Sequence, residues 1–270
     1  MDIRDIKEKV EYPGVSALAD IFALQKVLLS QYIDIESLPP YPMDLNTKES
    51  QVWAKDFTGR IIEELGEGYE SYEIMMSMFH QGIDEAEMIP HLQNFNEETS
   101  DAIHFWLELM IYSGYEVNHM LNWMLEYVDR EAVIGLDPLH SWFQIAAAHV
   151  EQDLAQAGRK VPCRWVIYDH QLEDEFLRGG RQLGSNRRDV MKQYLWDITY
   201  HIQIARNTLK NKPWKQTEMM TDFKQYEDSM RKATLALFKF FYFAGFTKES
   251  IYVIYFKKNL VNQFRIKSKY

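Results

Sequence analysis

Cysteine and long hydrophobic runs are scarce in this 270-residue chain. Its single cysteine, Cys163, can form neither an internal disulfide nor a cysteine-based zinc cluster, which favours a reducing setting such as the cytoplasm. The longest apolar run, residues 233–246, is interrupted by Thr234 and Lys239 and is too short to span a bilayer. The first residues, MDIRDIKEKVEYPG, lack the apolar core of a signal peptide. We therefore expect a cytoplasmic protein with no membrane partner.

Positive charge is also in deficit. The chain has 30 Lys+Arg residues against 40 Asp+Glu residues, a formal net charge of −10. Phosphate backbones are bound by basic surfaces, so this balance argues against a nucleic-acid-binding protein. It does not exclude an enzyme that acts on nucleotides, because metal ions can bridge an acidic protein and an acidic substrate. A hydrophobic content of 46% indicates a globular chain with ample material for a core.

Strand patterns are nearly absent, and apolar residues recur at helical spacing along most of the chain. Only residues 161–168, VPCRWVIY, suggest a strand. Asn96 is a plausible N-cap for one helix, which Gly114 would end. The pattern predicts helices over residues 17–32, 48–79, 97–113, 116–127, 138–157, 189–209, 221–244 and 248–264. We expect an all-α, multi-helix bundle.

The length suits one large domain or two small ones, and a single domain over residues 1–270 is expected. Residues 101–115 and 232–246 are similar to each other: both are apolar stretches that end in a small residue, glycine and an aromatic residue. No motif explains about residues 126–217, which are interpreted as an inserted or degenerate-repeat helical region.

The stretch IIEELGEGYESYE, residues 61–73, contains five glutamates and two glycines. On a helical wheel, Glu63, Glu67 and Glu70 lie opposite the apolar side, with Glu64 at the edge. An amphipathic helix explains this pattern without any site. However, like charges one turn apart repel by roughly 0.2–0.5 kcal/mol per pair, and each glycine costs about 1 kcal/mol relative to alanine. A solvated face and a metal site are equal alternatives on this segment alone.

A second acidic pair lies in NEETSDAIHFWLELM, residues 96–110. Glu98 and Asp101 are one turn apart at the start of a stretch so apolar that it should be buried. Buried carboxylates must be paired, protonated or bound to metal. The alternative, acids favoured by the dipole at a helix start, explains Glu97 better than Asp101. Two carboxylate pairs on separate helices suit hard divalent cations such as Mg²⁺.

The C-terminal segment YFKKNLVNQFRIKSKY has five basic residues and no acid. Lys258, Asn262 and Arg265 fall on one helical face, with Asn259 nearby. Cations at helix C-termini are common because of the helix dipole, but that preference does not account for the asparagines.

Together, Glu-x-x-Glu, then Glu-x-x-Asp entering an apolar helix, then Tyr-x-x-Lys-Asn-x-x-Asn-x-x-Arg resemble the all-α NTP pyrophosphatases (MazG-like). Within them the chain is most similar to the dimeric dUTPases and phage dCTPase/dUTPases. The resemblance covers residues 21–29, 61–115 and 247–270. It implies a homodimer that hydrolyses a deoxynucleoside triphosphate to the monophosphate and pyrophosphate. dUTP is favoured, with dCTP or dTTP as alternatives. It also implies two or three Mg²⁺ ions per site, which Mn²⁺ can replace, and a host cytoplasm if the protein is of phage origin.

The resemblance also assigns residues. It makes four carboxylates the metal ligands: Glu64, Glu67, Glu98 and Asp101. It makes a fifth, Glu63, the acid that orients the attacking water. It makes five further residues contact the substrate: Lys258 and Arg265 at the phosphates, Asn259 and Asn262 near the sugar or base, and Gln25 at the base.

Three positions depart from the family's pattern: Leu29, Ile266 and Lys269 replace a polar residue, glutamine and glycine. An apolar residue at a base edge removes a hydrogen bond that enforces discrimination, so these changes bear on the base more than on the chemistry.

Two other classes of protein stay open. Glu116-x-x-His119 resembles one ligand pair of a di-iron carboxylate oxidase, but the second such pair is missing. A non-catalytic, all-α interaction protein would need the acids only as solvated faces. The loop KNKPWKQTE, residues 210–218, places Trp214 among three lysines and suits either a nucleotide-facing loop or an ordinary amphipathic one.

Overall fold

The computed structural model describes residues 6, 9–133, 135–157, 184–212, 214 and 216–268. Within these residues the regular structure is entirely helical, which confirms the predicted all-α class. The strand suggested at residues 161–168 lies outside the described residues. No helix in the described part is long and apolar enough to cross a membrane. The elements are α1 (Ala17–Glu36), α2 (Lys48–Gln81), α3 (Glu85–Tyr112), α4 (Val117–Met124), α5 (Pro138–Gln156), α7 (Gly184–Thr208), α8 (Phe223–Ala244) and α9 (Lys248–Ser268), with 3-10 turns at Gly14–Ser16 and Arg130–Ala132.

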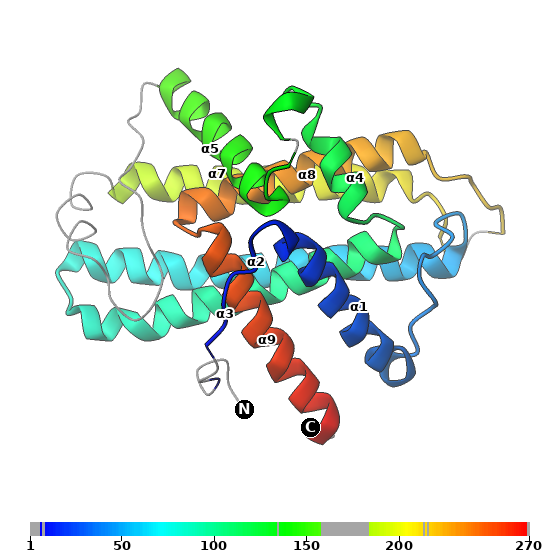
Figure 1. The fold of residues 1–270 in the computed structure, drawn as a ribbon, viewed down its shortest axis with the longest axis horizontal. Coiled ribbons are helices and arrows are strands. Elements are labelled where there is room, and N and C mark those ends of the chain that lie inside the picture. The colour runs from blue at the N-terminus through cyan, green and yellow to red at the C-terminus, as the bar shows by residue number, and fades with distance from the viewer. Residues whose placement is uncertain are drawn as a thin grey trace.

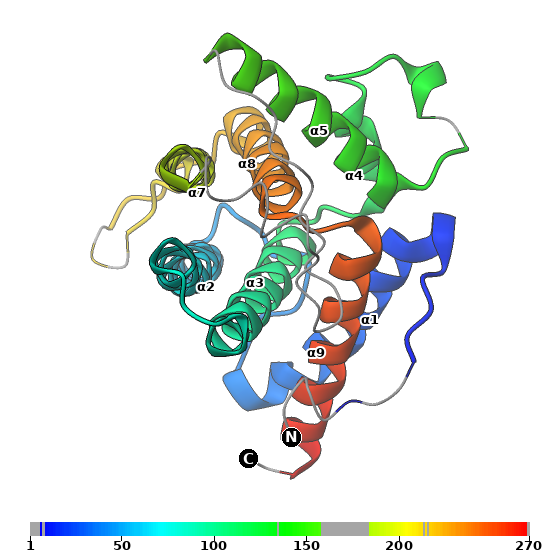
Figure 2. The same ribbon diagram turned by 90° about the vertical axis from the view of Figure 1, so that its left-hand side faces the viewer.

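Two helical hairpins form the body of the protein. The hairpin of α2 and α3 lies beneath the hairpin of α7 and α8, and the four long helices run side by side (Figure 1). The view along these helices shows their arrangement in two layers (Figure 2). Helix α5 covers α8, and α1 and α9 pack together against α3. Helix α9 therefore carries the basic C-terminal segment across the helix that holds Glu98 and Asp101.

The start of α3 differs from the prediction. Asp84 caps the helix by accepting a hydrogen bond from the backbone N–H of Ala86, so Asn96 lies well inside it. The predicted cap at Asn96 is wrong because the apolar face already begins at Met88, which is 1% exposed. Pro90 lies in the second turn of α3, where it removes one backbone hydrogen bond without ending the helix. The other predicted helices are present, with ends that differ by a few residues.

The similar segments at residues 101–115 and 232–246 occupy corresponding places. Each forms the later part of the second helix in a hairpin, and each ends at a glycine with positive φ, Gly114 at 82° and Gly245 at 100°. Only glycine adopts this conformation without strain, which explains why both helices end in the same way.

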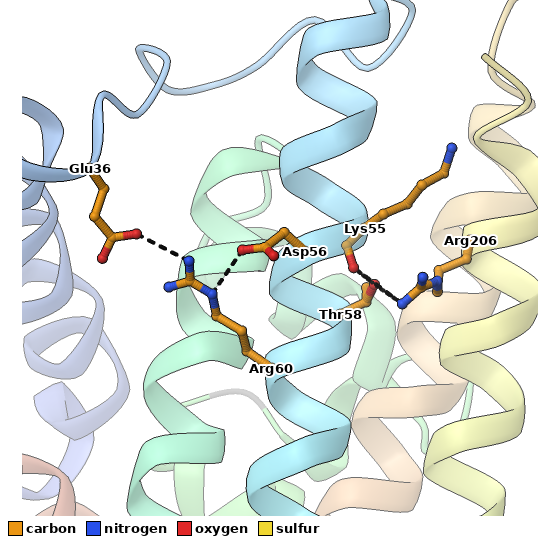
Figure 3. Close-up of polar contacts among 6 residues, drawn as sticks. All are labelled: Glu36, Lys55, Asp56, Thr58, Arg60 and Arg206. Atoms are coloured by element: carbon orange, nitrogen blue, oxygen red, sulfur yellow. Dashed lines mark hydrogen bonds and ion pairs between the residues drawn. The ribbon is translucent and has the colours of Figure 1, made fainter. Parts of the chain in front are cut away.

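An arginine on α2 connects α2 with both α1 and α3. The Nη2 atom of Arg60 lies 3.2 Å from Glu36 on α1, and its Nε atom lies 2.8 Å from Asp56 on α2 (Figure 3). Its guanidinium carbon lies 5.3 Å from the centre of the Phe105 ring on α3. This residue holds α1, and with it Gln25, against the α2–α3 hairpin.

Candidate functional site

Three carboxylates meet between α2 and α3. One oxygen atom each from Glu64, Glu67 and Glu98 lie within 4.8 Å of one another. Glu64 and Glu67 are one turn apart on α2, and Glu98 faces them from α3. The structure thus brings together three of the four expected metal ligands. We call this group the acid cluster.

A glycine sets the distance between the two helices at the acid cluster. A Cβ atom added at Gly68 would lie 3.4 Å from the Cβ atom of Glu98 and 3.5 Å from the ring of Phe95, at van der Waals contact. A larger side chain would push α3 away and carry Glu98 with it. Gly66, by contrast, faces open space. This close approach explains why a glycine, which destabilises a helix relative to alanine, is found at position 68.

Burial and mutual repulsion keep protons on the acid cluster. Burial, and then the charge of Asp101, raise the pKa of Glu64 to about 8, and its hydrogen bond with Glu98 adds to the effect. Burial also raises the pKa of Glu98, while the hydrogen bond from Glu64 acts in the opposite direction. Without a cation, Glu64 therefore keeps its proton and donates a hydrogen bond to Glu98. Hard oxygen donors that carry unrelieved negative charge fit a Mg²⁺ site.

We expect the metal-free protein to lose stability because of Glu64 as the pH rises from about 5 to 8. The folded-state pKa of about 8 lies above the ordinary value of 4.5, so in this window the folded state binds more protons than the unfolded state. Urea midpoints in EDTA at pH 5, 6.5 and 8 measure the effect. Glu64→Gln should flatten the decline, whereas Glu70→Gln, on the exposed face of the same helix, should keep it. An equal decline in Glu64→Gln would show that the acid cluster does not hold this proton.

Asp101 lies beside the acid cluster and is paired with Lys258 of α9. The Nζ atom of Lys258 lies 2.7 Å from Oδ2 of Asp101 and 2.9 Å from Oε1 of Glu97. Burial raises the pKa of Asp101, and the charge of Lys258 offsets only part of that effect. Burial alone would lower the pKa of Lys258, but the two carboxylates outweigh burial. The net effect is a raised pKa. The expected metal ligand Asp101 and the expected phosphate ligand Lys258 thus neutralise each other in this structure.

Glu97 has a role that the sequence analysis missed. Its interpretation as a helix-start acid is wrong, because α3 begins at Glu85 and Glu97 lies inside it. Glu97 is the second carboxylate partner of Lys258, and Lys258 is 2% exposed. The available signal was spacing, since Glu97 and Asp101 are four residues apart and share one helical face.

Gln25 of α1 lies at the centre of a buried polar network. It is 0% exposed, and its Oε1 atom lies 2.8 Å from Nδ1 of His104 and 2.9 Å from the hydroxyl of Tyr255. Its Nε2 atom donates to Glu108 at 3.1 Å. Because the carbonyl oxygen of Gln25 only accepts, Nδ1 of His104 carries the hydrogen. Burial lowers the pKa of His104 to about 3, so the ring is neutral, and its Nε2 atom has no partner among the described residues.

Glu108 is a further site candidate that the sequence analysis passed over, and Tyr255, which begins the C-terminal motif, was given no role there. Burial, and then repulsion from Glu36, raise the pKa of Glu108 to about 8, so this carboxyl group is largely protonated near neutral pH. The ring of Tyr255 stacks on His104 with centroids 4.4 Å apart. The signal for Glu108 was a lone acid within the apolar run of α3. Leu29, by contrast, is 0% exposed and belongs to the apolar core.

The asparagines of α9 differ in their surroundings. Asn259 is 1% exposed, and its Nδ2 atom lies 3.5 Å from both the Leu24 carbonyl and the Tyr255 hydroxyl. Its Oδ1 atom accepts a hydrogen bond from Gln263 at 2.7 Å. Asn259 therefore joins the Gln25 network, whereas Asn262 is half-buried one turn further along the helix.

Arg265 and Glu63 lie at the edges of the site. Arg265 is half-buried on α9, and its charge is close enough to lower the pKa of Asp101 in part. Glu63 is exposed on α2 and does not belong to the acid cluster. The roles that the resemblance assigns to them stay predictions.

The ligand pair of the di-iron alternative has a structural role instead. His119 accepts a hydrogen bond from the backbone N–H of Glu116 in the capping box that begins α4. The carboxylate of Glu116 pairs with Lys26 of α1. Neither residue belongs to the acid cluster, so the geometry gives no support to a di-iron centre there.

The geometry defines a class of protein: an all-α bundle with a carboxylate cluster between two antiparallel helices. A sequence model of the dUTPase family matches residues 85–270, more than half of the chain. The chain therefore belongs to the dUTPase family. The matched segment contains Glu98, Asp101 and Lys258, whereas Gln25 and Glu64 precede it. No curated protein and no solved structure gives a significant match.

Proposed function

We propose that the protein is a Mg²⁺-dependent deoxynucleoside triphosphate diphosphatase that releases a monophosphate and pyrophosphate. dUTP is the favoured substrate, and dCTP and dTTP are the alternatives. The observation that carries the proposal is the meeting of Glu64, Glu67 and Glu98 in a chain that belongs to the dUTPase family. Three carboxylates held together repel one another, and a bound divalent cation would offset that repulsion.

The acid cluster supplies the oxygen donors for the metal. Two or three bound Mg²⁺ ions, or Mn²⁺ in their place, would supply charge neutralisation for the polyphosphate and a more acidic water. The chain's own part is to fix Glu64, Glu67 and Glu98 across the helix pair. Asp101, on the same face of α3 as Glu98, is the fourth donor once it exchanges Lys258 for a cation.

The basic residues of α9 serve the phosphates. Lys258 lies against Asp101 and Glu97, so its ammonium group is already placed beside the acid cluster. A triphosphate offers Lys258 new anionic partners at the same time as a metal ion takes its place at Asp101. Arg265 lies further along the same helix and extends the positive charge. Catalysis then rests on positioning and charge compensation, as is usual for phosphoryl transfer.

The Gln25 network serves the base. A uracil ring has two carbonyl acceptors and one N–H donor, and a cytosine ring replaces one carbonyl with an amine. Gln25 now donates to Glu108, and the buried Nε2 atom of His104 has no partner among the described residues, so once the network opens these groups would offer a donor and an acceptor for such edges. Asn259 and Asn262 follow on α9 and would contact the sugar or the base.

Replacing Gln25 should affect substrate binding more than turnover. We expect Gln25→Leu to raise KM for the preferred dNTP by about tenfold, with a smaller change in kcat, and to weaken discrimination among pyrimidines. Gln51→Leu is the matched control, since Gln51 is also 0% exposed but bonds to Leu45 and Thr221. It should lower stability and leave KM and base preference unchanged. Equal kinetics in the two variants would remove Gln25 from the base site.

Initial rates on a panel of dNTPs test the proposed function. The wild-type protein should release pyrophosphate from one or more pyrimidine dNTPs in the presence of Mg²⁺ or Mn²⁺ and much more slowly from dATP and dGTP. Absence of turnover on every dNTP would overturn the proposal and favour the non-catalytic alternative.

We further propose a homodimer that acts in the cytoplasm, in accordance with the resemblance to the dimeric dUTPases. Light scattering on the purified full-length chain tests the dimer, for which twice the chain mass of 32.1 kDa is expected. A single-chain mass at micromolar concentration would contradict it.

A further inference from the structure

Three cations gather on the side of α2 that faces α7. Arg206 of α7 donates from Nη1 to the Lys55 carbonyl and to Oγ1 of Thr58, both at 3.1 Å (Figure 3). The Nζ atom of Lys55 donates to the carbonyl of Asn211 at 3.1 Å. Lys212 follows Asn211 and is half-buried. These hydrogen bonds to the main chain hold Lys55 and Arg206 in place, and the ammonium group of Lys55 extends away from the guanidinium group of Arg206 (Figure 3).

No carboxylate in the described part of the chain is among the groups that shift the pKa of Lys55. The charges that act on Lys55 are those of Lys212 and Arg206, and together with burial, the largest cause, they lower the pKa of Lys55 to about 8. The neighbouring carboxylate, Asp56, is paired with Arg60 instead. Uncompensated positive charge is unexpected in a chain with a formal net charge of −10. Like charges repel, so a fixed group of this kind is stabilised by a bound anion.

An exposed aromatic ring borders the three cations. Trp214 is 77% exposed, and the Nζ atom of Lys212 lies 5.9 Å from the centre of its ring. An exposed indole offers a flat apolar surface on which a nucleobase can stack. Lysine and arginine side chains are the usual partners of phosphate groups.

The group is separate from the acid cluster. Lys55 and Glu64 both lie on α2, but roughly 14 Å apart along its axis and on opposite sides of it, as helix geometry dictates. Glu64 faces Glu98 on α3, whereas Lys55 faces the segment that follows α7. An anion held by Lys55 would therefore not contact the acid cluster of the same chain.

We propose that Lys55, Arg206 and Lys212 form a second anion site, which binds a phosphate group. The phosphate is either a free ion, such as inorganic phosphate or pyrophosphate, or part of a nucleotide whose base rests on Trp214. Pyrophosphate is of particular interest because it is a product of the proposed reaction. The site itself depends only on the three cations and stands apart from the proposed function.

Calorimetric titration of the full-length protein in EDTA tests this site, because binding through metal at the acid cluster is then excluded. Inorganic phosphate, pyrophosphate and dUMP are the three probes. Lys55→Met and Lys212→Met should each weaken binding by about tenfold, the usual effect of losing one charge-assisted hydrogen bond. Lys224→Met, at an exposed position on α8, is the matched control and should bind like the wild type. Glu98→Gln should also bind like the wild type, since the two sites are separate.

Trp214→Ala distinguishes the two sources of phosphate. Weaker binding of dUMP alone identifies a nucleotide, and unchanged binding of all three probes identifies a free phosphate ion. The proposal is overturned by absence of binding to the wild type at millimolar concentrations, or by equal affinity in wild type, Lys55→Met and Lys212→Met. Either result leaves the hydrolytic function untouched, because that function is measured at the acid cluster with metal present.

Discussion

Glu98→Gln is expected to lower the Mg²⁺-dependent turnover of dUTP by at least about 100-fold. Changes in residues that merely support a metal ligand cost about 10–100-fold in affinity or activity, so the loss of a direct carboxylate ligand should cost more. Glutamine has nearly the same shape, and its amide can still bond to Glu64 across the helix pair. Because the change also removes a charge that repels Glu67 and Asp101, the metal-free variant should unfold at the same or a higher urea concentration than the wild type.

The matched control for Glu98→Gln is Glu70→Gln. Glu70 is exposed on α2 and lies outside the acid cluster, so the control removes the same charge and should keep activity within about twofold. Initial rates of pyrophosphate release and urea midpoints are measured for both variants. Near-normal turnover by a folded Glu98→Gln variant would exclude the acid cluster from the mechanism.

Lys258→Met is expected to destabilise the metal-free protein by about 3–5 kcal/mol. Removal of one partner from a buried ion pair leaves an uncompensated charge in the interior, and losses of this size are typical. The Lys258 side chain is 3% exposed and has two carboxylate partners, whose side chains are 21% and 28% exposed. Methionine fills similar volume, so the loss reports charge rather than packing. Urea unfolding at pH 7 in EDTA measures it.

Two comparisons sharpen the Lys258 experiment. Lys257→Met changes the adjacent residue of α9, which is less buried, and should cost less than about 0.5 kcal/mol. Adding Mg²⁺ should restore part of the stability of Lys258→Met, because a cation at Asp101 replaces the missing charge. A Lys258→Met protein as stable as the wild type in EDTA would contradict the assignment of Lys258 as the neutralising partner of Asp101 and Glu97.

Periodicity was enough to predict the all-α class, whereas the choice of Glu64, Glu67 and Glu98 among the acidic residues came from the resemblance to the dUTPases. Side chains three residues apart share a helical face, so each acidic pair could be assigned to one side of its helix from the sequence. That α2 and α3 form a tight hairpin was not predicted, because the sequence analysis began the second helix at residue 97 and the structure begins it at Glu85. Gly68 permits the close contact, but its importance depends on which residue lies opposite, and spacing does not give this.

The remaining features depend on contacts between distant parts of the chain. The partner of Glu97 and Asp101 is Lys258 on α9, so spacing within α3 could not show that Asp101 is paired and not free for metal. In the same way, the order of residues does not show that Gln25 of α1 meets Glu108 of α3. Helical periodicity tells which face is buried, but tertiary packing decides what each buried polar group meets.

The most direct test of the central claim is product analysis by phosphorus NMR when the wild-type protein is incubated with dUTP. With Mg²⁺ present, we predict equal amounts of dUMP and pyrophosphate, and with EDTA in its place, no turnover above background. Formation of dUDP and inorganic phosphate, turnover that persists in EDTA, or no turnover of dUTP or any other dNTP would contradict the account.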